Sequence, residues 1–187
     1  SEIVGRQIEV GFALEETRGT AESVAEKWLR NVQANIVERS EKVVDDATRG
    51  RLEDSEGARI VKKWVEGDLQ GIAHADALGY LLYNLYGAVS TQTVSGSVKD
   101  HTFSLLQNIQ VPSLTLFAKD GSVQQRVYNG GTISSLELTA VVDNYVRFTA
   151  NFMAKEGASN ADTPSYDTEY DFIGKDVSIK FADTEGG

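Results

Sequence analysis

The fold class is decided by the stretch VPSLTLFAKDGSVQQRVYNGGTISSLELTAVVDNYVRFTANFMA, residues 111–154. Apolar and polar residues alternate along it, which is typical of strands with one buried face. Residues that favour turns divide it into four short runs. These turns are Lys119-Asp120-Gly121, Asn129-Gly130-Gly131 and Asp143-Asn144. The stretch therefore predicts an antiparallel meander, with a hairpin turn at Gly130-Gly131, and it contains almost no group capable of covalent chemistry.

The last strand of this meander has one apolar and one polar face. The apolar face consists of Val146, Phe148, Ala150 and Phe152. The opposite face carries Tyr145, Arg147, Thr149, Asn151 and Met153. Antiparallel sheets commonly bury one face and leave the other solvated. We therefore expect the first set in the core and the second set against water or a partner.

The rest of the chain adds strands and one helix. Alternation predicts strands over 3–14, 28–38, 58–71, 101–107 and 177–181. Leucines at helical spacing predict a single helix over about 74–87, with an acidic residue in its first turn and Gly87 at its C-terminal cap. The fold class expected from these patterns is mainly β: an antiparallel β-sandwich or barrel with one flanking helix.

Residues 40–57 break the strand pattern. This segment mixes acidic and basic residues with Gly50 and Gly57 and has few large apolar side chains. It is expected to be a long exposed loop, and loops of this length in compact domains are usually functional or disordered. Its candidate contact residues are Asp45, Asp46, Arg49, Arg51, Glu53 and Asp54.

Composition restricts the partners. The 187 residues carry a formal net charge of −10, which disfavours tight binding to a nucleic acid backbone. No apolar run approaches the roughly 20 residues that span a bilayer, so no membrane partner is expected. The absence of cysteine rules out disulfides and thiolate chemistry, and it favours folding in a reducing compartment such as the cytoplasm.

The residues predict no catalytic, cofactor or metal site. His74 and His101 are the two histidines, and they lack the spacing of metal ligands. No P-loop, dinucleotide-binding or nucleophile-elbow motif occurs. The acidic run 167–171 could offer oxygens to calcium, but it lacks the glycine and the spacing of an EF-hand. An enzyme is therefore not expected.

The order of several segments resembles the major tail tube proteins of long-tailed bacteriophages. The resemblance is carried by GFALEETRGTA (11–21), VEGDLQGIAHADALGYLLYNLYGA (65–88), HTFSLLQ (101–107), VPSLTLFAKDG (111–121) and YNGGTISSLELTAVVDNYVRFTANFMAKEGA (128–158). It covers roughly Gly11 to Ala158. The domain expected from it spans residues 1–158, and the acidic residues 159–187 either complete that domain or begin a second one.

The resemblance implies a structural virion protein that self-assembles into stacked, hexameric rings and forms a conduit for DNA ejection. The loop at 40–57 would then contact the next ring, and Arg147, Thr149 and Asn151 would face the lumen or a seam between subunits. The implied partners are other copies of the chain, the tape measure protein, the tail terminator and DNA in transient passage. The implied location is the phage tail, after folding in the host cytoplasm.

Two alternatives remain open. The first is a related part, such as a tail terminator, a joining ring or the tube of an injection device. The second is a non-catalytic β-sandwich that binds a ligand through exposed aromatic residues. The candidates for that role are Trp28, Trp64, Tyr128 and Tyr145.

Overall fold

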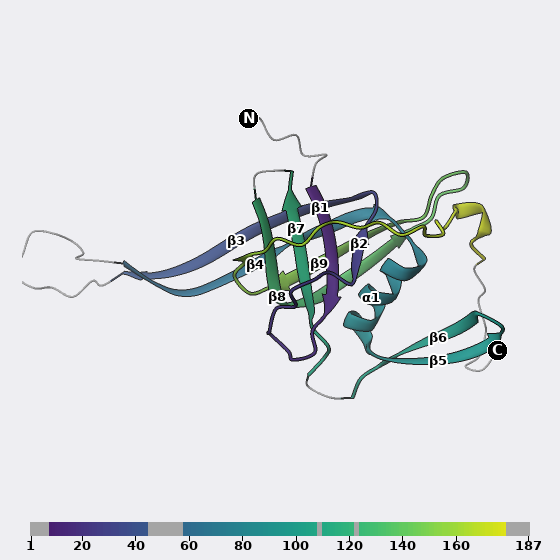
Figure 1. The fold of residues 1–187 in the computed structure, drawn as a ribbon, viewed down its shortest axis with the longest axis horizontal. Coiled ribbons are helices and arrows are strands. Elements are labelled where there is room, and N and C mark those ends of the chain that lie inside the picture. Colours follow the sequence, from purple (N-terminus) through teal and green to yellow (C-terminus); the bar gives the residue numbers. More distant parts are fainter. Residues whose placement is uncertain (1–7, 45–57, 108–109, 122–123, 179–187) are drawn as a thin grey trace, which may run out of the picture.

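The computed structural model describes residues 8–44, 58–107, 110–121 and 124–178, and it confirms the expected mainly β, antiparallel fold (Figure 1). The strands are β1 (Ile8–Leu14), β2 (Lys27–Leu29), β3 (Val32–Val44), β4 (Ala58–Ile72), β5 (Gly87–Ser95), β6 (Val98–Leu105), β7 (Leu114–Asp120), β8 (Gln124–Thr139), β9 (Arg147–Ala154) and β10 (Ala158–Ser159). The helices are α1 (Ala75–Tyr86) and the short 3-10 helix η2 (Gly174–Asp176).

Two layers of antiparallel strands share the long strand β8. The order is β2-β1-β7-β8-β9-β4-β3, and β10 also pairs with β8. The first half of β8 pairs with β7, and its second half pairs with β9. Strands β2 and β3 are the two ends of this order, so the described strands form an open, folded-over sheet. Of the two architectures expected, the sandwich-like one is confirmed and the closed barrel is wrong.

The bend in β8 lies at Gly130-Gly131, where the sequence predicted a hairpin turn. That prediction is wrong, because β8 continues through both residues into the second layer. Gly130 has a φ of 65°, and a Cβ on Gly131 would lie 2.7 Å from the Leu114 carbonyl oxygen. The two glycines thus form a bulge that bends one strand. Residues that favour tight turns also favour bulges, which explains the wrong prediction.

The carboxylate of Glu15 and the side chain of Asn84 hold this bend from two sides. Glu15 Oε1 accepts hydrogen bonds from the backbone N–H of Gly130 at 2.6 Å and from Thr115 Oγ1 at 3.1 Å. Asn84, on α1, donates to the Gly131 carbonyl at 3.2 Å and accepts from the Ile133 N–H at 2.6 Å. The polar backbone groups that a bent strand leaves unpaired are thereby satisfied.

We expect opposite effects from alanine at two glycines. Gly130→Ala should lower the free energy of unfolding by about 1–2 kcal/mol, because L-residues disfavour a positive φ. Gly79→Ala, in α1, should raise it by up to about 1 kcal/mol, since a Cβ there meets no atom within 4 Å and glycine weakens helices. Urea denaturation of both variants measures the difference. Equal effects would contradict the assignment of Gly130 to the bend.

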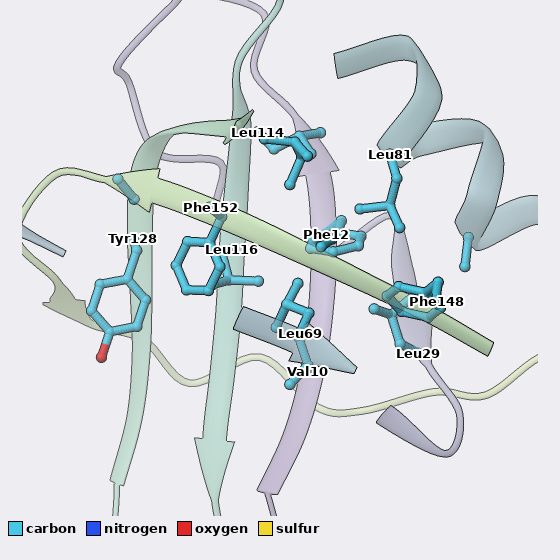
Figure 2. Packing of buried hydrophobic residues seen from close by; sticks show 14 of the residues in the cluster. Val10, Phe12, Leu29, Leu69, Leu81, Leu114, Leu116, Tyr128, Phe148 and Phe152 are labelled. Atoms are coloured by element: carbon cyan, nitrogen blue, oxygen red, sulfur yellow. The ribbon is translucent and has the colours of Figure 1, made fainter. Parts of the chain in front are cut away.

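The core lies between the two layers and under α1 (Figure 2). Phe148 and Phe152 of β9 meet Phe12 of β1 and Leu116 of β7 there, and Leu81 of α1 closes one end. The alternation expected along the last strand is confirmed, because all four of its apolar residues are buried. A smaller cluster on the outside of β1 and β7 joins Trp28 to Phe117, with ring centroids 6.1 Å apart.

Helix α1 follows the sequence closely. It spans Ala75–Tyr86, and Gly87 caps it in the left-handed conformation, with φ of 88° and its N–H bonded to the Tyr83 carbonyl. Within the described ranges, no helix combines the length and apolarity needed to cross a membrane.

Two hairpins project from opposite ends of the molecule (Figure 1). One is the outer part of β3 and β4, residues 39–44 and 58–64, which we call the arm. The other is β5–β6, whose first strand the sequence did not predict. The loop expected at 40–57 is too long, because β3 runs to Val44 and β4 starts at Ala58. Residues 40–44 are exposed on both faces of the arm and need no apolar stripe, so their charged side chains resembled a loop, whereas 58–64 were predicted as strand.

Two other strand predictions need correction. The run 28–38 is divided between β2 and β3 by Asn31, which has a φ of 54°. The strand expected at 177–181 is absent at its first two residues, which follow η2 in an irregular conformation, and 179–181 lie outside the described residues.

Candidate functional site

The outward side of the β8-β9-β4-β3 layer forms a polar surface, which we call the polar face. Strand pairing aligns its side chains in rows across the sheet. One row joins Ser135, Asn151, Asp68 and Asn35, and the next joins Glu137, Thr149, Gln70 and Gln33. The flanking rows add Thr139, Arg147 and Ile72 on one side, and Met153, Glu66 and Val37 on the other.

Hydrogen bonds between neighbouring strands and within β4 fix several polar groups on this face. Asn151 Nδ2 donates to Ser135 Oγ at 2.7 Å. Asp68 accepts from Asn35 at 3.2 Å and from Gln70 at 2.9 Å. Asn151 and Ser135, and likewise Asn35, Gln70 and Asp68, are therefore held in place by hydrogen bonds within the polar face.

The sequence predicted one strand of this surface. Arg147, Thr149 and Asn151 lie together on the outward side of β9, as the alternation indicated. The residues that surround them on β3, β4 and β8 were not predicted, because pairing between strands far apart in sequence cannot be read from alternation within one strand. The shared signal is an unusual share of amide and hydroxyl side chains at alternate positions.

A second cluster of charged residues lies at the base of the arm, where it meets the polar-face residue Glu66. Glu66 accepts a hydrogen bond from Arg39 Nε at 2.8 Å and from Trp64 Nε1 at 3.2 Å, and these two bonds lower the pKa of its carboxyl. The Lys62 ammonium lies 4.8 Å from the centre of the Trp64 ring, in a cation–π contact. The six loop candidates, Asp45, Asp46, Arg49, Arg51, Glu53 and Asp54, lie outside the described residues.

A segment that we call the strap, residues 160–173, crosses the body and is fixed at several points. Asp162 accepts from the Ala25 N–H at 2.8 Å, and the Tyr166 hydroxyl donates to Glu9 at 2.8 Å. Near its end, the Phe172 carbonyl accepts from the Val146 N–H at 2.8 Å. The first half of the strap thus contacts the layer that contains β1 and β2, and its last residues contact the layer that contains β9.

Lys27 of β2 is the main ionic anchor of the strap. Its side chain is 7% exposed, and its Nζ lies 2.9 Å from Glu169, 3.1 Å from Asp76 and 3.2 Å from Asp167. The Glu169 side chain is 1% exposed. Burial alone lowers the pKa of the Lys27 amine, but hydrogen bonds to the three carboxylates outweigh it and hold that pKa above its ordinary value.

His74 extends this cluster. It is buried, with Nδ1 2.8 Å from Asp171 and Nε2 3.1 Å from the Arg30 carbonyl. The acidic run that the sequence left as a weak calcium candidate is therefore occupied by contacts with Lys27 and His74. Tertiary pairing explains these carboxylates, and their spacing in the sequence carried no sign of it.

The aromatic residues considered for ligand binding do not form a common surface. Trp28 and Tyr128 are buried, at 2% and 5% exposure, and contribute to packing. Trp64 is half-buried on the arm, and Tyr145 is exposed near the start of β9. A stacking platform for a carbohydrate would need such side chains side by side in the open.

The described residues thus form a folded-over sheet with a polar face on one layer and a hairpin at each end. The family model described as "Phage tail tube protein" matches residues 5–187, so the chain belongs to the phage tail tube protein family. It is a structural protein of the phage tail.

Comparison with solved structures finds a similar chain in the "Tail of empty GTA particle computed with helical refinement, C6 symmetry". The two chains are 8% identical, with a TM-score of 0.44, and the match covers 84% of this chain and 98% of that one. No curated protein matches the chain.

Proposed function

We propose that copies of this chain assemble into stacked rings that form the wall of a tail tube, with the polar face toward the lumen. The observation that carries the proposal is the continuous polar face across four strands in a member of the tail tube family. A six-fold ring is proposed on the resemblance of the segments between Gly11 and Ala158 to major tail tube proteins.

The chemistry of the polar face suits a conduit for DNA. Its rows contain one cation, Arg147, and three anions, Glu66, Asp68 and Glu137, for a net charge of 1 − 3 = −2. Tight binding to phosphates requires clustered lysine and arginine. A weakly acidic wall rich in amides and hydroxyls, several of which are already hydrogen-bonded within the sheet, offers passing DNA few fixed contacts. No covalent chemistry is needed for this role.

The remaining assignments complete the proposal. The arm and the loop candidates beyond it would contact the neighbouring ring, and the tape measure and tail terminator proteins would contact the lumen and the end of the tube. The contacts of the strap support its inclusion in the tube domain. Folding in the host cytoplasm before incorporation into the virion agrees with a chain that lacks cysteine.

A single cysteine at Asn151 tests the orientation of the polar face. Assembly of concentrated protein should give tubes about 10 nm across by negative-stain microscopy, a width set by a six-membered ring of domains this size. In such tubes, the thiol of Asn151→Cys should react with a small maleimide but react slowly with a maleimide attached to a large polymer. In unassembled subunits it should react with both.

Val142→Cys supplies the matched control, because Val142 is 75% exposed in the loop between β8 and β9. Protection of the thiol at 151 from both reagents would place the polar face in a seam between subunits. Fast reaction of that thiol with both reagents would place it on the outside of the tube. Either result contradicts a lumenal face.

A further inference from the structure

We infer that Asn129 is a site of spontaneous deamidation that is reactive in the unfolded chain and protected in the folded one, with Glu15 as the residue that protects it. The sequence contains a single Asn-Gly pair, Asn129-Gly130, and this pair lies at the bend of β8. The inference does not depend on the tube function, because it concerns the chemistry of the subunit before it assembles.

Deamidation at an Asn-Gly pair proceeds through a five-membered succinimide ring. The backbone nitrogen of Gly130 loses its proton to a base in the solvent and attacks Cγ of Asn129, and Nδ2 takes up a proton and leaves as ammonia. Water then adds to either carbonyl of the ring and breaks one of its two C–N bonds, which gives aspartate or isoaspartate. Glycine favours the attack, because it has no Cβ and gives an unfolded chain more conformational freedom.

In the folded chain, the peptide group between these two residues is hydrogen-bonded at both of its ends. Its N–H donates to Glu15 Oε1 at 2.6 Å, and its carbonyl accepts from the backbone N–H of Lys155 at 2.9 Å. The carboxylate disfavours loss of the amide proton, because that loss would place a second negative charge beside it. The peptide must also rotate out of the strand before the nitrogen can reach Cγ, and this rotation breaks both hydrogen bonds.

The amide group that would leave is held as well. Asn129 Nδ2 donates to the Gly19 carbonyl, and Lys155 Nζ lies 3.4 Å from the same oxygen. The aliphatic part of Lys155 also packs over the bend, since a Cβ built on Gly130 would lie 3.5 Å from its Cε. The side chain of Asn129 is therefore fixed on the side where Gly19 lies.

Glu15 connects these contacts to one another. Besides the Gly130 N–H, its carboxylate accepts from the backbone N–H of Gly19 at 2.6 Å, from the Thr115 hydroxyl at 3.1 Å and from the Ser113 hydroxyl. It thus holds both the attacking nitrogen and the loop whose carbonyl binds the leaving amide. Protection of both reacting groups depends on this one carboxylate.

The modified chain would not regain the bend. Aspartate at position 129 would set a carboxylate oxygen against the Gly19 carbonyl oxygen in place of the donor that bonds it now. Isoaspartate would add a methylene group to the backbone at the bend of β8. Chains that stay unfolded would therefore lose their ability to fold with time, whereas folded chains would keep it.

Peptide mapping by mass spectrometry tests the inference on the full chain. The wild-type protein is incubated at mildly alkaline pH, either folded in buffer or unfolded in guanidinium chloride. The tryptic peptide 127–147 is then followed for replacement of an amide NH₂ by OH. This peptide also contains Asn144, which precedes Tyr145 and serves as an internal reference. In the unfolded chain, Asn129 should react faster than Asn144. Folding should slow the reaction of Asn129 at least about tenfold, because only chains that open locally can react.

Glu15→Gln tests the protecting residue. Glutamine keeps the size of the side chain but removes its charge, so Asn129 in the folded variant should react faster than in the folded wild type. Glu16→Gln, at the exposed neighbouring position, is the matched control and should leave the rate unchanged. Far-UV circular dichroism shows whether each variant is folded.

Two comparisons within the wild-type chain need no variant. Equal rates at Asn129 in the folded and unfolded chains would overturn the inference, as would an unfolded chain in which Asn129 reacts no faster than Asn144. A Glu15→Gln variant that is folded and reacts at the wild-type rate would overturn the role of Glu15.

Discussion

Lys27→Met is expected to lower the free energy of unfolding by about 3–5 kcal/mol, the usual cost of removing one partner from a buried ion pair. The substitution leaves Glu169, whose side chain is 1% exposed, without the cation 2.9 Å away. Asp76 and Asp167 lose the same partner, but both are more than half exposed and regain water. We therefore assign most of the decrease in the free energy of unfolding to the buried carboxylate of Glu169, which is left without its cation.

Two measurements separate this account from a simple loss of packing. Urea denaturation gives the loss of stability, and limited proteolysis reports whether the strap opens before the body unfolds. The double variant Lys27→Met, Glu169→Leu should recover most of the loss, because replacing both members of a buried pair with apolar residues is often neutral. A double variant that is as unstable as the single one would show that Lys27 stabilises the protein by other means.

The Lys27 cluster also shows where sequence reasoning stops. Lys27 lies 49 residues from Asp76 and 140 from Asp167, and no local period links them. Local patterns did predict the two faces of β9 and the helix with its glycine cap. In those cases, the residues that determine the structure lie within one element, and burial acts on each of them at the period of that element.

The bend in β8 illustrates a different limit. Gly130 supplies the positive φ, and Gly131 the absence of a Cβ, that a tight hairpin needs, but a bulge needs the same properties. The partners decide between the two: Glu15 and Asn84 satisfy the backbone on either side of the bend. Neither partner lies near the glycines in sequence, so the turn signal alone could not distinguish a chain reversal from a strand that changes layers.

The outer part of β3, residues 40–44, was missed for a third reason, although the β4 half of the arm lies in the strand predicted over 58–71. Alternation reports burial, and residues 40–44 have no buried face to report. Their pairing depends on backbone hydrogen bonds and on cross-strand neighbours such as Glu41 opposite Lys62. Exposure on both sides is the feature that weakens the strand signal of residues 40–44 in a single sequence.

Asn84→Leu is the second substitution with a large expected effect, a loss of about 3 kcal/mol. Asn84 is 1% exposed and bonds three backbone groups: it donates to the Pro112 carbonyl at 2.9 Å and the Gly131 carbonyl at 3.2 Å, and it accepts from the Ile133 N–H at 2.6 Å. Leucine has a similar size but leaves these groups unpaired, and a buried unsatisfied donor or acceptor costs about 1–3 kcal/mol. Thermal and urea unfolding measure the loss.

Asn84→Asp distinguishes hydrogen bonding from packing at this position. Aspartate keeps the shape and can still accept from Ile133, but it sets a carboxylate oxygen against two carbonyl oxygens, so we expect it to be at least as destabilising as leucine. Asn35→Leu is the matched control: its amide bonds Asp68 on the exposed polar face, where a surface substitution changes stability by about 0.5 kcal/mol or less. A mild Asn84→Asp variant would mean that the side chain fills space under α1 without holding the bend. The bend carries β8 from one layer to the other. If Asn84→Asp is strongly destabilising, it should therefore also abolish tube assembly, while the Asn35→Leu variant still assembles.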